Sequence, residues 1–117
     1  MNGVLILAHG SRRKETENTL QKVAQMVKEK ITVPTEIAYM EFSDQNIAYG
    51  LDQLVSKGIS QIKVVPYFLF SGIHILEDIP KELNDYVRKH PGVSITMGDT
   101  LGADPRIADI LVDRIMA

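Results

Sequence analysis

Short apolar segments along this chain alternate with longer stretches of helical spacing. Residues 4–8 form a continuous apolar run, which predicts a strand covered on both faces as in a parallel sheet, and residues 36–42, 61–69 and 93–97 predict three further strands. Between and after them, apolar positions recur at three- and four-residue steps. This spacing predicts amphipathic helices over residues 13–30, 43–57 and 74–90, and from residue 104 onward.

Residues with special backbone preferences mark the expected helix ends. Ser43 or Asp44 is suited to cap the second helix, and Gly58 to end it. Pro80 is tolerable only in the first turn of a helix, so the third helix is expected to start close to His74. Pro91-Gly92 breaks that helix, and Asp104-Pro105 opens the last one.

Four alternating strand–helix units predict a single doubly wound α/β domain over residues 1–117. Its four-stranded parallel sheet would be flanked by helices on both faces, because parallel strands need right-handed crossovers. We expect the strand order 2-1-3-4. Phe68, Leu69 and Phe70 are expected in the core, with one of them able to flank a flat ligand.

The composition narrows the function. The chain has no cysteine, which excludes disulfides, Cys-ligated metals and a thiol nucleophile. No apolar segment approaches the roughly 20 residues that span a bilayer, and a net charge of −2 argues against nonspecific nucleic-acid binding. We therefore expect a cytoplasmic protein that binds neither a membrane nor nucleic acid.

The carboxyl ends of the first three strands present His9, Glu41 and His74. Neighbouring parallel strands end at one edge of a sheet, so these side chains can converge. Two imidazoles and a carboxylate suit a borderline divalent metal such as cobalt, nickel, iron or zinc. In the alternative reading, the histidines bond backbone groups in loops and Glu41 is simply solvated.

Other readings of these loops stay open. Ser11 beside His9 invites a hydrolase interpretation, but the G-x-S-x-G motif is absent. Residues 10–14 could instead form an anion cradle from amide groups, a helix dipole and cations. Asp78 could orient His74 or merely favour the helix N-terminus, and His90 is most simply a cation at a helix C-terminus.

Three segments in this order resemble the short CbiX-type sirohydrochlorin chelatases, a cobaltochelatase group of the class II chelatase family. They are LILAHGSR (residues 5–12), PYFLFSGIHILEDIP (66–80) and LGADP (101–105). The similarity covers nearly the whole chain. H-G-S-R combined with G-x-H-x-x-x-D-I-P is far more specific than either motif alone.

The resemblance implies ATP-independent insertion of a divalent metal into sirohydrochlorin, in cobalamin or tetrapyrrole biosynthesis. Co²⁺ is the favoured metal, with Ni²⁺ or Fe²⁺ open, and no cofactor is expected beyond this metal substrate. His9 and His74 would bind the metal and accept protons, and Glu41 would be a further ligand. Relatives commonly carry a proline just after Glu41, where this chain has Phe42-Ser43-Asp44.

The resemblance also bears on the substrate and the assembly. Sirohydrochlorin would bind against Gly10, Ser11 and Arg12 on one side of the site and Phe70, Ser71 and Gly72 on the other. Its carboxylates would meet the local groups beside His9, namely Ser11, Arg12, Arg13 and Lys14. Because longer relatives contain two such halves, a chelatase half-domain implies a homodimer. The alternative function is a non-catalytic flavodoxin-like module that binds an anionic or phosphorylated ligand at residues 10–14.

Overall fold

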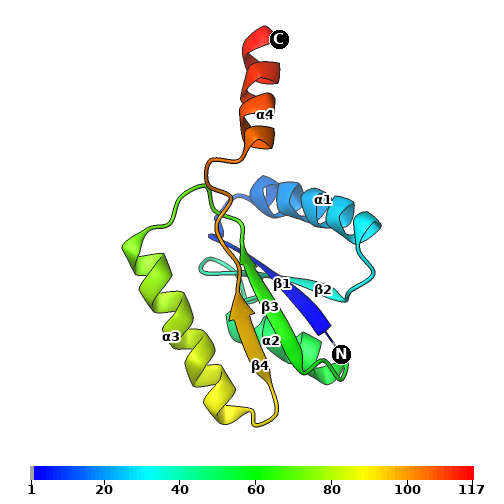
Figure 1. Ribbon diagram of the computed structural model, residues 1–117, viewed down its shortest axis with the longest axis vertical. Helices are drawn as coiled ribbons and strands as arrows, with labels where there is room; N and C mark the ends of the chain where they lie inside the picture. Colours follow the sequence, from blue (N-terminus) through cyan, green and yellow to red (C-terminus); the bar gives the residue numbers. More distant parts are fainter. Residues whose placement is uncertain (1) are drawn as a thin grey trace.

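The structure, a computed structural model, describes residues 2–117 apart from the side chains of residues 74–76. Strands and helices alternate along the chain (Figure 1). In order they are β1 (Asn2–Ala8), α1 (Lys14–Lys30), β2 (Thr35–Tyr39), α2 (Ile47–Ser56), β3 (Gln61–Pro66), α3 (Ile73–Lys89), β4 (Ser94–Met97) and α4 (Pro105–Met116).

The four strands form one parallel sheet with the order β2-β1-β3-β4, which confirms the predicted topology. β1 lies in the interior of the sheet, where Leu5 pairs with Glu36 of β2 and Val64 of β3. Both neighbours run parallel to β1, so all the strand ends that precede helices lie along one edge. We call this edge the rim.

The main core lies between one face of the sheet and helices α2 and α3. Leu5, Leu7 and Val64 of the sheet are fully buried there against Leu51 and Leu54 of α2. α3 adds further apolar side chains, namely Ile79, Leu83 and Tyr86. Full burial of each large apolar side chain stabilises the fold by about 1.5–3 kcal/mol, which is why this packing fixes the positions of the strand ends.

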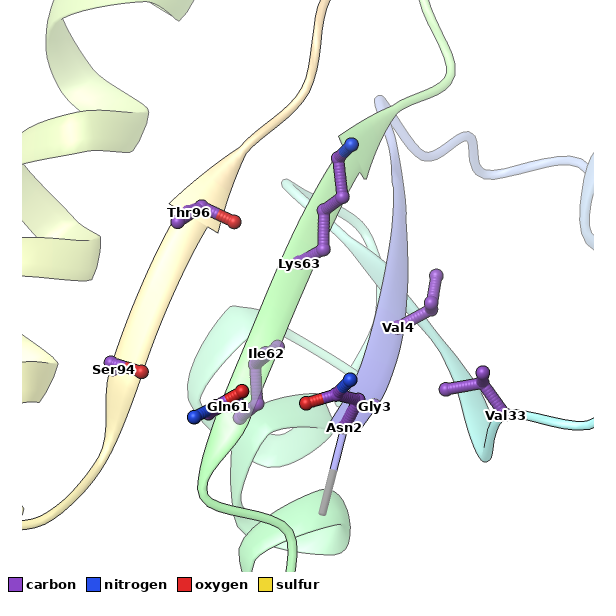
Figure 2. A pocket seen from close by; sticks show the side chains of 9 residues that line it. All are labelled: Asn2, Gly3, Val4, Val33, Gln61, Ile62, Lys63, Ser94 and Thr96. Atoms are coloured by element: carbon purple, nitrogen blue, oxygen red, sulfur yellow. The ribbon is translucent and has the colours of Figure 1, made fainter.

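The other face of the sheet is only half covered. α1 buries Leu20 and Ala24 against Ile6, Ala8 and Tyr39 of β1 and β2. The other half of this face carries polar side chains around a hollow of about 350 Å³, including Gln61, Lys63, Ser94 and Thr96 (Figure 2). α4 does not cover it, because this helix extends away from the sheet beyond the rim (Figure 1).

α2 begins later than the sequence suggested. Its N-cap is Asn46, whose side-chain oxygen accepts a hydrogen bond from the Tyr49 amide at 2.9 Å, so the prediction of Ser43 or Asp44 was wrong. Ser43 instead accepts a hydrogen bond from the Gln45 amide inside the preceding loop. The other end of α2 is as predicted, with Gly58 in the left-handed region (φ +85°).

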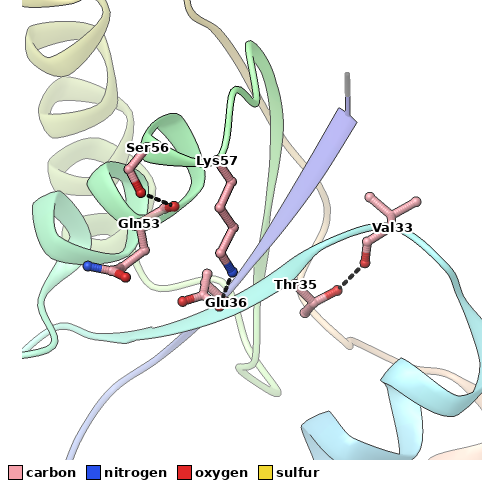
Figure 3. Close-up of polar contacts among 6 residues, drawn as sticks. All are labelled: Val33, Thr35, Glu36, Gln53, Ser56 and Lys57. Carbon is pink, nitrogen blue, oxygen red and sulfur yellow. Dashed lines mark hydrogen bonds and ion pairs between the residues drawn. The ribbon is translucent and has the colours of Figure 1, made fainter.

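A polar contact ties α2 to the edge strand beside it. Lys57, at the C-cap of α2, lies 3.4 Å from the Glu36 carboxylate of β2 (Figure 3). The Thr35 hydroxyl, in the same strand, donates to the Val33 carbonyl (Figure 3). Half-exposed ion pairs of this kind contribute little energy. The position of α2 therefore depends on its buried apolar side chains.

Two further expectations need correction. Pro80 lies inside α3, well beyond its first turn. A proline there removes one backbone donor, and the burial of Ile79 and Leu83 offsets that loss.

Leu69 and Phe70 are exposed, and of the three residues expected in the core only Phe68 packs against it. β3 ends at Pro66, so residues 69 and 70 belong to the rim.

Strand β2 ends at Tyr39, three residues before the predicted end.

Among the described residues, no helix is both long and apolar enough to cross a membrane. The cytoplasmic location expected from the sequence stays a prediction.

Candidate functional site

Backbone hydrogen bonds continue beyond the strands and join the loops of the rim. The Glu41 amide donates to the His9 carbonyl at 3.1 Å, and the Tyr67 amide donates to the Leu7 carbonyl at 2.7 Å. The Leu101 amide donates to the Phe68 carbonyl at 2.8 Å. The loops after β1, β2, β3 and β4 therefore form one connected surface.

His9 and Glu41, predicted to converge at this edge, are brought together by the structure. Nε2 of His9 lies 3.2 Å from Oε1 of Glu41, and their side chains are 62% and 47% exposed. An exposed polar contact of this kind contributes little to stability. The same openness leaves imidazole and carboxylate accessible to a ligand that approaches the rim.

Gly10 makes this close approach possible. Its backbone has φ +97°, and a Cβ at this position would overlap the carbonyl oxygen of Glu41. Any other residue would be strained in this left-handed backbone conformation, and its Cβ would push the two loops apart. Gly10 is therefore a spacing element of the site, a role that its place after a strand did not reveal.

A hollow of about 320 Å³ lies beside His9, between the end of β1 and the first turns of α1. Tyr67 lines it together with His9 and Gly10, and Thr16, Thr19 and Leu20 of α1 form its other wall. On another side, the His9 ring meets the Phe68 ring edge to face, with the ring centres 6.0 Å apart. The imidazole thus stands between an aromatic neighbour and an open hollow.

The positive end of the rim lies at the start of α1. Ser11 accepts a hydrogen bond from the Arg13 amide at 3.1 Å, and the guanidinium of Arg12 lies 4.8 Å from the centre of the Phe42 ring. Phe42 has φ +59°, a conformation that is costly for a bulky residue. The loop after β2 thus places an aromatic ring under Arg12, beside Glu41.

Apolar side chains gather on the other side of the rim. We call this the rim patch; it consists of Leu69, Phe70, Ile73 and Leu101, all exposed, with Phe70 at 81%. Ser71, in the same loop, shares a hydrogen bond of 3.0 Å with Thr100, and Gly72 is the N-cap residue of α3. Residues 70–72 thus lie at the rim as expected, and their role in binding stays a prediction.

His74 is the second residue of α3, and its side chain lies outside the described residues. The proposed third ligand is therefore not placed relative to His9 and Glu41. Within the described part of the chain, no group of three or more His, Asp or Glu side chains is arranged to hold a metal ion. Of the three predicted metal ligands, the described side chains include His9 and Glu41, which lie next to each other.

The sequence did not single out several residues that the structure places at the site. Tyr67 lines the hollow beside His9, Thr100 shares a hydrogen bond with Ser71, and the Phe42 ring lies under the Arg12 guanidinium. Tyr67 could have been found, because it directly follows the strand that leads to the rim. No local pattern connects Thr100 with Ser71, since their contact depends on the pairing of β3 and β4.

Comparison with known proteins gives a consistent picture. The family model described as CbiX matches residues 3–117. A sirohydrochlorin ferrochelatase of Priestia megaterium is 34% identical over 98% of this chain, which covers 44% of the relative. A sirohydrochlorin cobaltochelatase of Methanopyrus kandleri is 32% identical over 98% of this chain, which covers 95% of that relative.

A solved structure shares the fold. The sirohydrochlorin chelatase SirB from Bacillus subtilis subspecies spizizenii, in complex with cobalt, superposes with a TM-score of 0.90 at 26% identity. The match covers 98% of this chain and 50% of that one. The chain thus spans about half the length of some relatives and nearly the whole length of others.

Proposed function

Because this chain belongs to the CbiX family of sirohydrochlorin chelatases, we propose that it inserts a divalent metal ion into sirohydrochlorin without ATP hydrolysis. The observation that carries the proposal is the His9–Glu41 pair on an open rim, with the imidazole 3.2 Å from the carboxylate. An anion-binding module would not require this pair.

The chemistry of metallation explains why these groups suit the task. The ion must lose water and be held loosely enough for release, and the macrocycle must give up two pyrrole protons as the metal enters. A neutral imidazole can bind a borderline metal and can accept a proton. The Glu41 carboxylate, 3.2 Å from Nε2 of His9, offers a second donor atom to the same metal ion.

We place the macrocycle across the rim, with His9 and His74 facing its pyrrole nitrogens. Arg12 and the amide and hydroxyl groups of Gly10 and Ser11 would meet its carboxylates. Phe70 offers an exposed aromatic ring for the macrocycle on the other side. His74 has this role by its place in the G-x-H-x-x-x-D-I-P motif.

Co²⁺ is the metal we propose first, with Ni²⁺ and Fe²⁺ as the other candidates. Imidazole and carboxylate donors suit all three ions, so the ligands alone do not select one. Relatives named for cobalt and for iron are similar to this chain to nearly the same degree. We also propose that the working unit is a homodimer.

The test is the absorbance change when the purified chain, sirohydrochlorin and one of the three metals are mixed. We expect insertion faster than the uncatalysed rate with at least one metal. His9→Ala and His74→Ala should each slow it by about 100-fold or more, the lower range for loss of an acid–base group. Equal rates with and without the protein, for all three metals, would exclude the function.

His90→Ala provides the matched control. This histidine lies at the far end of α3, where Nδ1 is 2.8 Å from the Tyr86 carbonyl and the ring stacks on Tyr86. It is remote from the rim, so its loss should leave insertion unchanged. A similar loss of rate in His90→Ala and His9→Ala would point to general damage and count against a specific role for His9.

A further inference from the structure

Phe42, in the loop after β2, has a strained backbone. Among the residues that the structure describes, it is the only one other than glycine with a positive φ, at +59°. This conformation is costly for a bulky side chain. Burial does not offset the cost, because the side chain is 51% exposed and belongs to neither core cluster. Strained residues of this kind persist where the surrounding structure holds them, and they are concentrated at functional sites.

Hydrogen bonds on both sides of Phe42 hold its backbone in place. Before it, the Glu41 amide donates to the His9 carbonyl at 3.1 Å, which joins this loop to the end of β1. After it, the Gln45 amide donates to the Ser43 hydroxyl at 3.0 Å. The loop is thus fixed at two points, and the direction of the Phe42 side chain between them is a built feature of the rim.

The ring that this backbone presents lies against Arg12, in the neighbouring loop. The guanidinium carbon of Arg12 is 4.8 Å from the centre of the ring. Within the described part of the chain, no carboxylate pairs with Arg12, whereas Arg13 lies 3.5 Å from Glu15. Two adjacent arginines are therefore held differently, one by an aromatic face and the other by an anion.

The kind of contact decides what Arg12 can still bind. An aromatic face attracts a guanidinium without accepting its N–H groups as a carboxylate does, so those donors stay available. A free guanidinium edge matches an incoming carboxylate through two parallel hydrogen bonds. A protein carboxylate in place of the ring would occupy the same donors and compete with the ligand. Phe42 therefore orients Arg12 without using the groups that bind an anion.

The same contact ties Arg12 to the predicted metal ligands. Phe42 directly follows Glu41, whose carboxylate lies 3.2 Å from His9. Arg12 is three residues after His9. The ring and the guanidinium thus form a second bridge between the loops that carry His9 and Glu41. The bridge sets the distance from the cation to the imidazole, which matters for a ligand that presents carboxylates and a metal-binding centre to the same surface.

We propose that Phe42 is a positioning residue: its strained backbone holds the ring under Arg12, and the ring orients the guanidinium toward a carboxylate of the tetrapyrrole docked at His9 and Glu41. This role rests on the proposed function and names the contact that sets how tightly the substrate is held. Phe42 acts through Arg12 on substrate binding, so its loss should change the KM for sirohydrochlorin much more than kcat.

Equilibrium titration of the chain with metal-free sirohydrochlorin tests this role without an insertion step. Phe42→Leu keeps a bulky apolar side chain but lacks the ring, and it should raise the dissociation constant by about 2- to 5-fold, the effect of one exposed cation–π contact. Arg12→Ala should raise it by about 10-fold or more, because a charge-assisted hydrogen bond is lost. Phe42→Tyr restores the ring and should recover most of the affinity that Phe42→Leu loses.

Combining the substitutions shows whether Phe42 acts through Arg12. In the Arg12→Ala chain, Phe42→Leu should have no further effect on the dissociation constant. Arg13→Ala is the matched control, because Arg13 already faces Glu15. In the Arg13→Ala chain, Phe42→Leu should weaken binding as much as it does in the unchanged chain. An equal loss from Phe42→Leu with and without the Arg12 side chain would overturn the positioning role.

Nuclear magnetic resonance tests the contact itself in the absence of substrate. The ring of Phe42 should shift the side-chain protons of Arg12 upfield in the unchanged chain and in Phe42→Tyr, and this shift should disappear in Phe42→Leu. Arg12 resonances that do not respond to Phe42→Leu would overturn the inference even if the chain binds sirohydrochlorin and inserts metal. Failure of the proposed function shows differently: the unchanged chain would not bind sirohydrochlorin at all, and the positioning role would fall with it.

Discussion

Gly10 lies directly against the backbone carbonyl of Glu41, in a conformation with φ +97°. An added Cβ would overlap that carbonyl oxygen, so Gly10→Ala must move the loop after β2 away from the end of β1. We expect the free energy of unfolding to fall by roughly 2–4 kcal/mol, from backbone strain and overpacking together. Metal insertion should fall with it, because His9 and Glu41 separate.

Gly58→Ala separates these two causes. Gly58 has a similar φ of +85°, but a Cβ there would meet nothing within 4 Å. This variant should lose only the strain, roughly 1 kcal/mol in denaturant unfolding, and keep its activity. If the two alanine variants were equally stable, the contact between Gly10 and Glu41 would not constrain the site.

Phe70 tests whether the rim patch binds the macrocycle. Its side chain is 81% exposed, so Phe70→Ala should change the free energy of unfolding by no more than about 0.5 kcal/mol. The KM for sirohydrochlorin should rise by roughly 5- to 10-fold, because one aromatic contact of about 1 kcal/mol is lost. Met26→Ala, an exposed site on α1, should leave the KM unchanged; equal KM values in both variants would remove Phe70 from the site.

The topology of the sheet was readable from the sequence because four short strand segments alternate with four stretches of helical spacing, which requires parallel strands joined by crossovers. The His9–Glu41 contact was also foreseeable, since both residues follow neighbouring parallel strands. The start of α2 was not, because Ser43, Asp44 and Asn46 are all competent caps. The Gln45 carbonyl, bonded to the Tyr39 amide, helps fix the loop in which Asn46 becomes the cap.

The placement of α4 could not be read from periodicity either. Asp104 and Pro105 correctly predicted where the helix begins. Its apolar spacing shows that one face requires burial, but the spacing is the same whether the partner is the chain's own sheet or another molecule. That Lys63 and Thr96 lie side by side on the uncovered half of the sheet, and make it polar, follows only from the pairing of β3 and β4.

Tyr39 is almost completely buried, and its hydroxyl has no hydrogen-bond partner within the described part of the chain. Burial, with a smaller effect from the charge of Glu17, raises the pKa of this tyrosine. Tyr39→Phe should therefore stabilise the fold by roughly 1 kcal/mol in denaturant unfolding, since it removes an unsatisfied buried group. A loss of stability would mean that the hydroxyl has a partner after all.

Tyr86→Phe should have the opposite effect. Its hydroxyl donates to the Asp52 carboxylate at 2.6 Å, and burial together with this hydrogen bond raises the pKa of Tyr86. Removal of the donor leaves a carboxylate without its partner, so we expect a loss of roughly 1.5–3 kcal/mol. The sign difference between the two variants distinguishes hydroxyl effects from a general effect of replacing tyrosine.

Asp104 controls the start of α4. Its carboxylate accepts hydrogen bonds from the Arg106 amide at 2.9 Å and from the Arg106 side chain at 2.8 Å. The side-chain bond, followed by the backbone bond, holds the pKa of Asp104 far below its ordinary value of 3.8. Because the folded-state pKa is depressed, the cap stabilises α4 fully above about pH 4 and loses this effect as the pH falls further.

Asp104→Asn is the variant that isolates this titration, since asparagine caps a helix equally well but carries no charge. In the unchanged chain, amide exchange in the first turn of α4, around Arg106 and Ile107, should become less protected relative to Asp104→Asn as the pH falls below about 4. Comparison of the two proteins at each pH cancels the intrinsic pH dependence of exchange. A constant protection ratio between them would show that the Asp104 carboxylate does not hold α4 at its first turn.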